Sequence, residues 1–350
     1  MQIKFGVVGF GFMGHCVADM LATFPEEQIR LTAVADINPE QLKDVPAGVE
    51  TYAGMDEMLS RADINTVIIS TPNPSHLEMV EKAAAAGKHI ICEKPAAMTV
   101  TQFDRMAEAA QRAGVVFTVH HQRRWDRDFR IMKEVYDRGM VGQPYVIKSQ
   151  LYGFNGNMHD WHIYPEMGGG MLYDWGVHLI DQMLEMVDTP VVSLYADLRN
   201  VINEWVDDYF NILLKFGNGV TGVIELGTYY LTPKRGWFIG GNEGSAIIDG
   251  WDGEGKIVRT AHLLQNVPGR ITMTAAGPTR SFGPPPPGLL IEEPLPEVNV
   301  SHRDYFDQFI RAMNGEEEPA VKTAQVRRVL RIMEAVRESA RTSKAVHPET

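Results

Sequence analysis

The chain has 350 residues, of which 44% are hydrophobic and 22% are charged, and its formal net charge is −12. This length allows two domains with substantial cores, and the composition is ordinary for a globular protein. The negative charge argues against nucleic acid or an anionic membrane as the main partner, because the overall field would repel either one.

Cysteine usage and hydropathy bear on the compartment. Cys16 and Cys92 both lie in apolar segments, which predicts free thiols in a reducing environment. No apolar run is long enough to span a bilayer. The apolar first residues contain Asp19 and lack a secretory cleavage site, so we expect no export signal and a cytoplasmic location.

Short apolar runs alternate with helical patterns over the first third of the chain. We expect strands at residues 3–9, 31–35, 66–70, 89–92 and 115–119, and helices at 15–24, 55–60, 75–86 and 101–112. Gly87 and Gly114 follow two of these helices, where glycine commonly ends a helix. The alternation predicts an α/β fold over residues 1–120, with a parallel sheet covered by helices on both faces.

The pattern changes after about residue 120, where strand-like runs dominate. We expect strands at 144–152, 191–197, 208–216, 220–230, 236–240 and 245–248, and helices at 128–138, within 168–187 and at 323–342. The proline-rich residues 275–298 are expected to form a loop and not a core strand. This predicts an α+β domain over residues 121–350 with a mostly antiparallel sheet, and a last helix that packs back toward the N-terminal domain.

A glycine-rich turn follows the first expected strand and opens the first helix. Its residues, in the spacing G-x-G-x-x-G, are Gly9, Phe10, Gly11, Phe12, Met13 and Gly14. The first glycine permits a tight turn, the second lets the backbone approach a pyrophosphate, and the third allows close packing of helix on strand. The helix N-terminus adds unpaired N–H groups for the phosphates. We therefore expect a dinucleotide site here.

Asp36 ends the second expected strand, twenty-two residues after Gly14. An acidic group at this distance would hydrogen-bond the ribose hydroxyls of the adenosine half, and its charge would repel a 2′-phosphate. No arginine stands among the next residues, Ile37, Asn38 and Pro39. The sequence therefore favours NAD over NADP, while a turn cap is the alternative role for Asp36.

Polar residues also follow the expected strand at 66–70. Ligands of open α/β sheets bind beyond the carboxyl ends of the strands. Thr71, Asn73 and His76 are therefore candidates for contact with the nicotinamide half of the cofactor. The alternative is a turn in which Ser75 begins the next helix.

Glu93 and Lys94 follow the strand at 89–92, again at a carboxyl end, and Pro95 makes the loop rigid in either its cis or its trans form. A lysine held in a cleft beside a nicotinamide can bind a substrate hydroxyl or join a proton relay. On an exposed loop it would be a solvated charge instead.

The segment Gly168–Asp181 joins a glycine run to a helix. Asp174 and His178 are four residues apart, so they share one helix face, which Asp181 extends. Histidine titrates near neutral pH, and a nearby carboxylate can orient its ring and raise its basicity. The pattern is typical of a proton-transfer site.

Together these motifs resemble those of the Gfo/Idh/MocA oxidoreductases, a family that contains sugar and inositol dehydrogenases. The resemblance extends over nearly the whole chain and rests on the glycine turn, Asp36, Lys94, Asp174 and His178. It implies an N-terminal Rossmann domain that binds a dinucleotide. It also implies a second domain with a large open sheet, which binds substrate and forms homodimers or homotetramers.

The resemblance further implies hydride transfer between NAD and a secondary hydroxyl of a sugar, inositol or related polyol. His178 would be the general base, Asp174 would orient it and bond a neighbouring hydroxyl, and Lys94 would bond the reacting oxygen. Glu93 and Lys94 would also border the cofactor.

Further substrate contacts are expected from four residues. Arg123 lies in the run Gln122–Asp126, which resembles the segment that opens the second domain in inositol-dehydrogenase-like members. Trp161 and His162 stand on a polar, aromatic loop, and Tyr230 ends a strand. The alternatives are a solvated loop for Trp161 and His162, and core or interface packing for Tyr230.

Three other functions fit parts of the pattern. Asp174, His178 and Asp181 could bind a divalent ion, but a catalytic zinc site usually has more histidine, so no metal is expected. A relative that uses NAD transiently could cleave glycosides, and a non-catalytic dinucleotide-sensing regulator could share the fold. The combination of Lys94, Asp174 and His178 favours the dehydrogenase.

Overall fold

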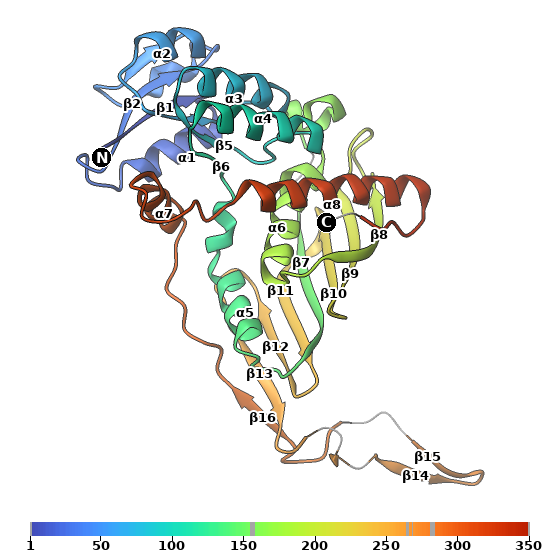
Figure 1. Cartoon of the computed structure of the whole chain (residues 1–350). Coiled ribbons are helices and arrows are strands. Elements are labelled where there is room, and N and C mark those ends of the chain that lie inside the picture. Colours follow the sequence, from blue (N-terminus) through green and yellow to red (C-terminus); the bar gives the residue numbers. More distant parts are fainter. Residues whose placement is uncertain (1, 155–157, 264–265, 268, 281–283, 349–350) are drawn as a thin grey trace.

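The computed structural model describes residues 2–154, 158–263, 266–267, 269–280 and 284–348. Figure 1 shows a compact N-terminal domain above a second domain with a long sheet, from which a narrow arm extends. No helix in the described ranges has both the length and the apolar character that a membrane crossing requires. Both cysteines are free, as expected.

Sheet A has six parallel strands in the order β3-β2-β1-β4-β5-β6. The strands are β1 (Ile3–Val8), β2 (Ile29–Ala35), β3 (Glu50–Tyr52), β4 (Thr66–Ile69), β5 (His89–Cys92) and β6 (Phe117–Val119). The helices between them are α1 (Phe12–Leu21), α2 (Met55–Arg61), α3 (His76–Ala85) and α4 (Val100–Ala113). The strand order reverses between β1 and β4, which is where doubly wound sheets bind dinucleotides. The predicted Rossmann fold is confirmed.

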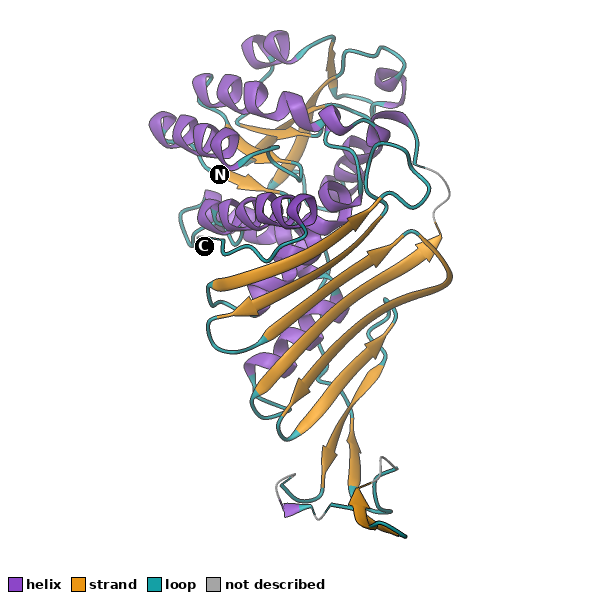
Figure 2. Ribbon diagram, turned by 90° about the vertical axis from the view of Figure 1, so that its right-hand side faces the viewer, coloured by secondary structure: helices purple, strands orange, loops and turns teal. Residues whose placement is uncertain are grey.

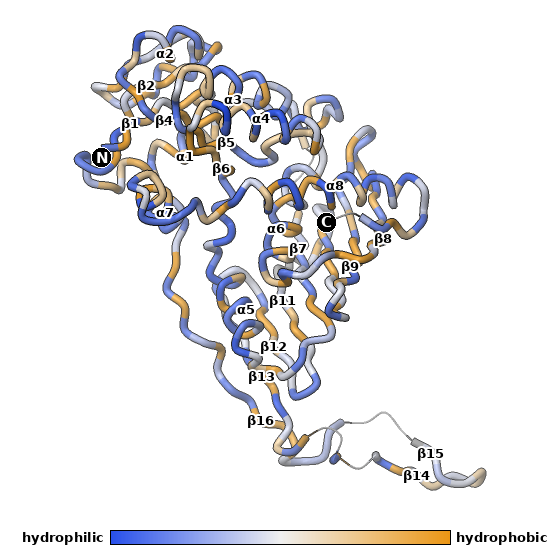
Figure 3. The backbone as a smooth tube through the Cα atoms, in the orientation of Figure 1, coloured by the Kyte–Doolittle hydropathy of each residue, from blue (hydrophilic) through white to orange (hydrophobic). Residues whose placement is uncertain are grey.

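Helices cover both faces of sheet A. On one face, Phe306 and Phe309 of α7 (Arg303–Met313) pack against Phe5 of β1, with ring centroids 6.4 and 6.1 Å apart. On the other face, a Cβ on Gly6 would lie 3.0 Å from Met58 of α2. Figure 3 shows apolar segments along the strands of this sheet, as burial on two faces requires. Helix α7, which the sequence analysis missed, thus completes the N-terminal core.

Sheet B has eight strands in the order β16-β13-β12-β11-β7-β10-β9-β8, and all neighbours are antiparallel except β7 and β10. The strands are β7 (Pro144–Phe154), β8 (Val191–Arg199), β9 (Tyr209–Phe216), β10 (Thr221–Gly227), β11 (Tyr229–Gly241), β12 (Gly244–Asp249), β13 (Gly255–Thr260) and β16 (Leu290–Glu293). The predicted α+β domain with a mostly antiparallel sheet is confirmed.

The proline-rich stretch is not wholly a loop. Its residues 290–293 form β16, which pairs with β13 at the edge of sheet B. Edge strands tolerate nearby proline because one side needs no ladder hydrogen bonds. Strands β14 (Ile271–Thr274) and β15 (Gly277–Arg280) pair only with each other among the described strands, on the arm seen in Figure 1.

Three helices, α5 (Arg127–Asp137), α6 (Val177–Met186) and α8 (Thr323–Thr342), cover one face of sheet B. Trp237 of β11 packs on Phe129 of α5, and a Cβ on Gly222 of β10 would lie 3.1 Å from Met183 of α6. Figure 2 shows the opposite face, with the strands in front and the helices behind them. No described helix covers this outer face.

Helix α8 lies between the two sheets and matches the predicted helix at 323–342. Glu334 accepts a hydrogen bond from the backbone N–H of Val100 in α4, at 2.9 Å. About one turn further along the helix, the Ser339 hydroxyl accepts from the N–H of Ala196 in β8, at 3.0 Å. Helix α8 therefore contacts elements that belong to both sheets' layers, α4 on one side and β8 on the other.

Candidate functional site

The glycine turn lies between β1 and α1, at the carboxyl edge of sheet A. Gly9 has a φ of +86°, and a Cβ there would lie 2.6 Å from the carbonyl oxygen of Ser70. A Cβ on Gly14 would lie 2.4 Å from the carbonyl oxygen of Gly9, whereas a Cβ on Gly11 would meet nothing within 4 Å. The first and third glycines thus close the turn, while Gly11 leaves open space that fits a diphosphate.

Helix α1 begins at Phe12, three residues earlier than expected, and Gly11 is its N-cap residue. No side chain caps this helix end, so its first N–H groups remain for ligand phosphates. Phe10 is buried, Phe12 is 82% exposed, and Met13 is half-buried. The backbone of this segment, more than its side chains, fits the cofactor.

Asp36 directly follows β2, and its carboxylate joins two loops. Oδ2 accepts the N–H of Phe10 at 2.6 Å, and Oδ1 accepts the N–H of Asn38 at 2.7 Å. The second bond is the turn contact that the sequence offered as the alternative. Each oxygen retains a further lone pair, so a bond to ribose remains compatible with these contacts and stays a prediction.

His76 supports the loops at the edge of sheet A. It is fully buried, and its ring nitrogens lie 2.8 Å from the carbonyl oxygen of Thr71 and 3.1 Å from that of Pro95. Burial lowers the pKa of His76, so the ring is neutral near neutral pH. The Thr71 hydroxyl lies 2.7 Å from that of Ser75. These hydrogen bonds join His76 and Thr71 to neighbouring loops of the protein. The contacts that the sequence predicts between these residues and the cofactor stay predictions.

Asn73 connects the two domains. Its Nδ2 donates to the carbonyl oxygens of Met167 and Gly168, both at 3.3 Å. The glycine at 168 is required here, because a Cβ would lie 2.5 Å from the same Nδ2 and the φ is +75°. Asn73 thus fixes the start of the segment Gly168–Asp181 relative to sheet A.

Lys94 follows β5, and its bond to Pro95 is cis. The ammonium donates to the carbonyl oxygen of Asp174 at 2.9 Å and to its Oδ1 at 3.0 Å. The two side chains are 14% and 27% exposed, so the pair is shielded but accessible. The fold brings together two of the three predicted catalytic residues.

Asp174 lies in a π-helical turn, Leu172–Gly176, that leads into α6. Such turns are rare and are frequent at functional sites. Asp174 was expected to orient His178, but its carboxylate bonds the charged Lys94, which is a stronger partner. Within the described residues, the buried Nδ1 of His178 has no hydrogen-bond partner.

His178 is 3% exposed. Burial lowers the pKa of its imidazole well below the usual value, and the nearby charges of Lys94 and Arg123 lower it further. The ring of His121 stands nearly perpendicular to it, with centroids 6.0 Å apart. His178 is therefore neutral near neutral pH and able to accept a proton.

Asp181 extends the same face but pairs elsewhere. Its two carboxylate oxygens accept from the Arg124 guanidinium at 2.7 and 2.8 Å, and both side chains are almost fully buried. Asp174 therefore pairs with Lys94, and Asp181 pairs with Arg124. In the part of the chain that the structure describes, no three His, Cys, Asp or Glu side chains are placed to hold a metal ion.

Glu93 is buried beneath the Lys94 loop. Its Oε1 lies 2.6 Å from Nδ1 of His120. Burial by itself would raise the pKa of Glu93, but His120 and Lys94 hold it below its ordinary value. The sequence predicted a cofactor contact for Glu93 and missed His120, because no local spacing links residues on two different strand ends.

Asp207 is a second residue that the sequence analysis missed. Its Oδ2 accepts the N–H of Leu172 at 2.7 Å, and its carbonyl oxygen accepts the N–H of Met171 at 2.8 Å. Burial raises the pKa of Asp207 to about 6. The side chain anchors the start of the π turn that carries Asp174.

Arg123 lies in a short helix, Gln122–Trp125, where the chain leaves sheet A. Its Nη1 donates to Asp126 at 3.2 Å, and its guanidinium lies 4.1 Å from the ring centroid of Trp175. Because Trp175 directly follows Asp174, this contact places Arg123 beside the segment Gly168–Asp181.

Trp161 and His162 lie in the short helix Asp160–Ile163, and their rings stack with centroids 3.8 Å apart. The carbonyl oxygen of His162 accepts the N–H of Gly170 at 3.1 Å. This loop therefore lies beside the glycine run that leads to Asp174, as a substrate-side loop would.

Tyr230 lies near the start of β11 and packs against a neighbouring strand. Its ring packs on Tyr152, with centroids 4.4 Å apart, and the Tyr152 hydroxyl donates to Glu225 of β10. Gly222 of the same strand faces Met183 of α6, and Glu225, three residues on, points to the opposite face. Tyr230 thus packs on the outer face of sheet B, across the sheet from α6, in agreement with the packing alternative, and its contact with substrate stays a prediction.

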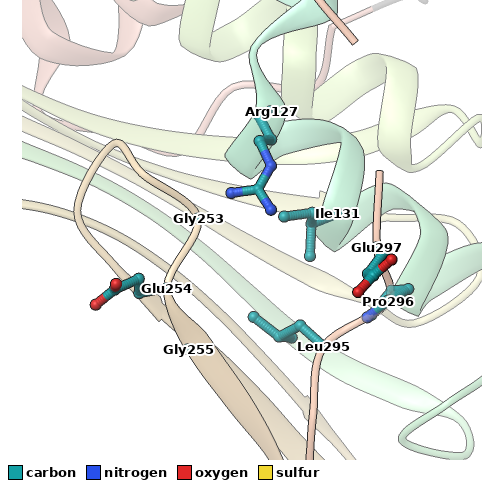
Figure 4. A pocket seen from close by; sticks show the side chains of 8 residues that line it. All are labelled: Arg127, Ile131, Gly253, Glu254, Gly255, Leu295, Pro296 and Glu297. Atoms are coloured by element: carbon teal, nitrogen blue, oxygen red, sulfur yellow. The ribbon is translucent and has the colours of Figure 1, made fainter. Parts of the chain in front are cut away.

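A separate pocket of about 410 Å³ lies between α5 and the chain near residue 296. Figure 4 shows Arg127 and Glu297 at its rim and Ile131 and Leu295 on its walls. Its lining includes none of the predicted catalytic residues.

Comparison with known families agrees with this geometry. Residues 3–121 match the family described as "Oxidoreductase family, NAD-binding Rossmann fold". Residues 129–247 match the "GFO/IDH/MocA C-terminal domain". The two matches follow each other in the order of the two sheets.

Individual relatives extend the comparison to the whole chain. A solved structure of an NAD-binding protein from Listeria innocua is 34% identical, with a TM-score of 0.90 and 99% of each chain covered. The scyllo-inositol 2-dehydrogenase (NADP(+)) of Bacillus subtilis is 25% identical over 98% of this chain and 95% of its own. The myo-inositol 2-dehydrogenase of Thermotoga maritima is 27% identical over 64% of this chain and 68% of its own.

Proposed function

The chain belongs to the Gfo/Idh/MocA family of NAD-binding oxidoreductases, and from this we propose that it transfers hydride between NAD and a secondary hydroxyl of a sugar, inositol or related polyol. The observation that carries the proposal is the contact of Lys94 with Asp174, next to the buried and neutral His178. This set provides a base and a cation for one hydroxyl group. The inositol dehydrogenases among its relatives support a polyol substrate.

Each residue of the set has a task that follows from its chemistry. Neutral His178 takes the hydroxyl proton, and the Lys94 ammonium hydrogen-bonds the same oxygen and stabilises the negative charge that develops there. Asp174 holds the ammonium in place, and its other carboxylate oxygen can accept a bond from a neighbouring hydroxyl. NAD, when bound, supplies the hydride acceptor.

For the cofactor, we propose NAD in preference to NADP. The carboxylate of Asp36 is bonded to the N–H of Phe10, so a negative charge stands directly beside the glycine turn. This charge would repel a 2′-phosphate at the same place. The NADP-dependent relative from Bacillus subtilis makes a side-by-side measurement of the two cofactors necessary.

We further propose a homodimer or homotetramer, in the cytoplasm, formed through the outer face of sheet B. Tyr195 and Leu213 are cross-strand partners on this face and are 45% and 37% exposed. Exposed apolar neighbours on an uncovered sheet face are common at interfaces, and a second copy of the same face would cover them.

The test combines a substrate screen with two variants. Reduction of NAD and of NADP is measured with cyclitols, aldoses, sugar acids and glycosides. Lys94→Ala and His178→Ala should bind NAD as the wild type does, by calorimetry, but lose roughly 100-fold or more of the turnover. Lys43→Ala, which removes a surface lysine paired with Glu40, is the matched control.

Two results would change the proposal. Full turnover in Lys94→Ala or His178→Ala would remove that residue from the mechanism. Cleavage of a glycoside without net NADH would replace the dehydrogenase by redox-assisted cleavage.

A further inference from the structure

Two indole side chains and one guanidinium group, from separate elements, meet at the segment Gly168–Asp181. The Arg123 guanidinium lies 4.1 Å from the ring centroid of Trp175 and 5.6 Å from that of Trp251. The two indoles meet edge to face, with centroids 5.8 Å apart. Trp251 lies in the turn between β12 and β13, whereas Arg123 and Trp175 lie in short helical segments. The cluster therefore connects the helical layer of the second domain with its sheet.

The cluster is continuous with the proposed catalytic site. Trp175 directly follows Asp174 in the π turn, and its ring centroid is 6.1 Å from that of His178. The ring centroid of Trp251 lies 5.8 Å from that of Trp175. A substrate ring at His178 would reach Trp175, and Trp251 lies one ring farther from the reacting carbon.

Trp251 is 50% exposed, although its indole is among the largest apolar side chains. Trp175 is half-buried and Arg123 lies close over its ring, whereas Trp251 is exposed, so Trp251 offers more accessible aromatic surface. An exposed aromatic group that adjoins a site and continues into it is typical of a ligand-binding surface.

The cluster is also held in place before any ligand binds. Asp126 accepts a bond from Arg123, and Gln182 of α6 donates to the carbonyl oxygen of Arg123 at 2.6 Å. Arg127 donates to the carbonyl oxygen of Asp252, which fixes the turn that carries Trp251. A preformed surface costs little ordering free energy on binding.

We propose that Trp251, supported by Trp175 and Arg123, forms an outer subsite that stacks a second six-membered ring joined to the ring being oxidised. The C–H face of a pyranose or cyclitol is flat and apolar, which suits an indole. The ion pair with Asp126 offsets the charge of Arg123, so the subsite favours an uncharged ring over a sugar acid. This inference rests on the proposed function, because the reacting ring is placed at His178.

The test compares probes with one and two rings in the presence of NAD. D-glucose and myo-inositol are the single-ring probes, and cellobiose, maltose and galactinol are the two-ring probes. Binding is followed by saturation-transfer NMR and calorimetry, and turnover by NADH formation. The variants are Trp251→Ala and Trp251→Tyr, with Leu263→Ala, an equally exposed residue on the arm, as the control.

In the wild type, at least one two-ring probe should bind better than its single-ring counterpart. Trp251→Ala should reduce this preference by roughly fivefold to tenfold, as expected for loss of one aromatic contact, and Trp251→Tyr should restore most of it. Leu263→Ala should leave the preference unchanged. Saturation transfer should reach the protons of both rings, and Trp251→Ala should reduce it on the ring that is not oxidised.

The outer subsite would be overturned if two-ring probes bind no better than single-ring probes. It would also be overturned if Trp251→Ala leaves the preference for two-ring probes intact. That result would leave the dehydrogenase proposal standing if the single-ring probes are still oxidised. Binding of two-ring probes that depends on Trp251 without any NADH formation would support the subsite and contradict the proposed reaction instead.

Discussion

The ammonium group of Lys94 donates to both the carbonyl and a carboxylate oxygen of Asp174, so a residue from sheet A is held by the segment that opens α6. We predict that Asp174→Asn lowers kcat by about 100-fold, because a neutral amide neither balances nor fixes the ammonium charge. Steady-state kinetics with the best substrate from the screen give the value.

Coupling between the two residues can be measured separately. If they act as a unit, Lys94→Met, Asp174→Asn and the double variant should lose turnover to a similar extent, far short of the product of the single effects. Losses that multiply would show that the residues act independently.

The fall of kcat/KM at low pH should reflect the protonation of His178. The base works when neutral, and its pKa is lowered by burial and by nearby positive charge, so kcat/KM should fall only well below pH 6.5. Arg123→Gln removes one of these charges and should move the fall to higher pH. Arg123→Lys keeps the charge and serves as the control. An unchanged profile in Arg123→Gln would contradict the assignment of His178 as the base.

Asp207 should make stability depend on pH. Burial raises its pKa from 3.8 to about 6, so the folded state favours the protonated form. The resulting stabilisation is fully present below about pH 4 and is lost as the pH rises through about 6. Asp207→Asn keeps an acceptor for the Leu172 N–H without the charge, so urea unfolding should show a flatter dependence over this range.

The hydrogen bond from the Leu172 N–H to Asp207 is tested by removing the acceptor. Asp207→Ala should lower the free energy of unfolding by about 1 kcal/mol, because the N–H of Leu172 loses its partner. A slope between pH 4 and 7 that is the same in Asp207→Asn and the wild type would assign the pH dependence to other groups.

Asp181 should matter for stability and little for chemistry. Asp181→Ala leaves the Arg124 guanidinium buried without its bidentate partner and should cost about 3 kcal/mol, since Glu185 at 3.2 Å still offers partial compensation. Thermal unfolding measures the loss. Turnover per folded molecule should stay within a fewfold of the wild type, and a loss as large as that of His178→Ala would make Asp181 a reacting group.

The outer face of sheet B should control assembly. Leu213→Asp places a charge opposite Tyr195, and burying that charge in an interface would be costly, so the variant should be monomeric by light scattering. Val201→Asp, at a loop position that is 55% exposed, is the control and should keep the wild-type mass. A wild-type monomer, or an unchanged oligomer in Leu213→Asp, would rule out this interface.

Elements with strong local signals could be predicted from the sequence. The bounds of β5 and α8 agree with the structure, because apolar residues recur at the period of each element and glycine or proline stands nearby. Strand β16 and helix α7 were missed: one lies among prolines, and the other is short and mostly polar on its exposed face.

The glycine turn and Lys94 could be predicted because their chemistry lies in a few consecutive residues. Asp207 and His120 could not, because each acts on a partner that is distant in sequence and is chosen by the fold. Tyr230 shows a further limit, since a position at a strand end does not tell which face of the sheet receives the side chain.

The N-terminal core depends on residues from the other end of the chain. Phe306 and Phe309 pack against Phe5, and the hydroxyl of Thr118 donates to the carbonyl oxygen of Val321 at 2.9 Å. During synthesis the Rossmann strands leave the ribosome long before these residues do. The N-terminal domain must therefore remain incompletely packed until α7 and the start of α8 have emerged, and the apolar face around Phe5 stays uncovered in the nascent chain until then.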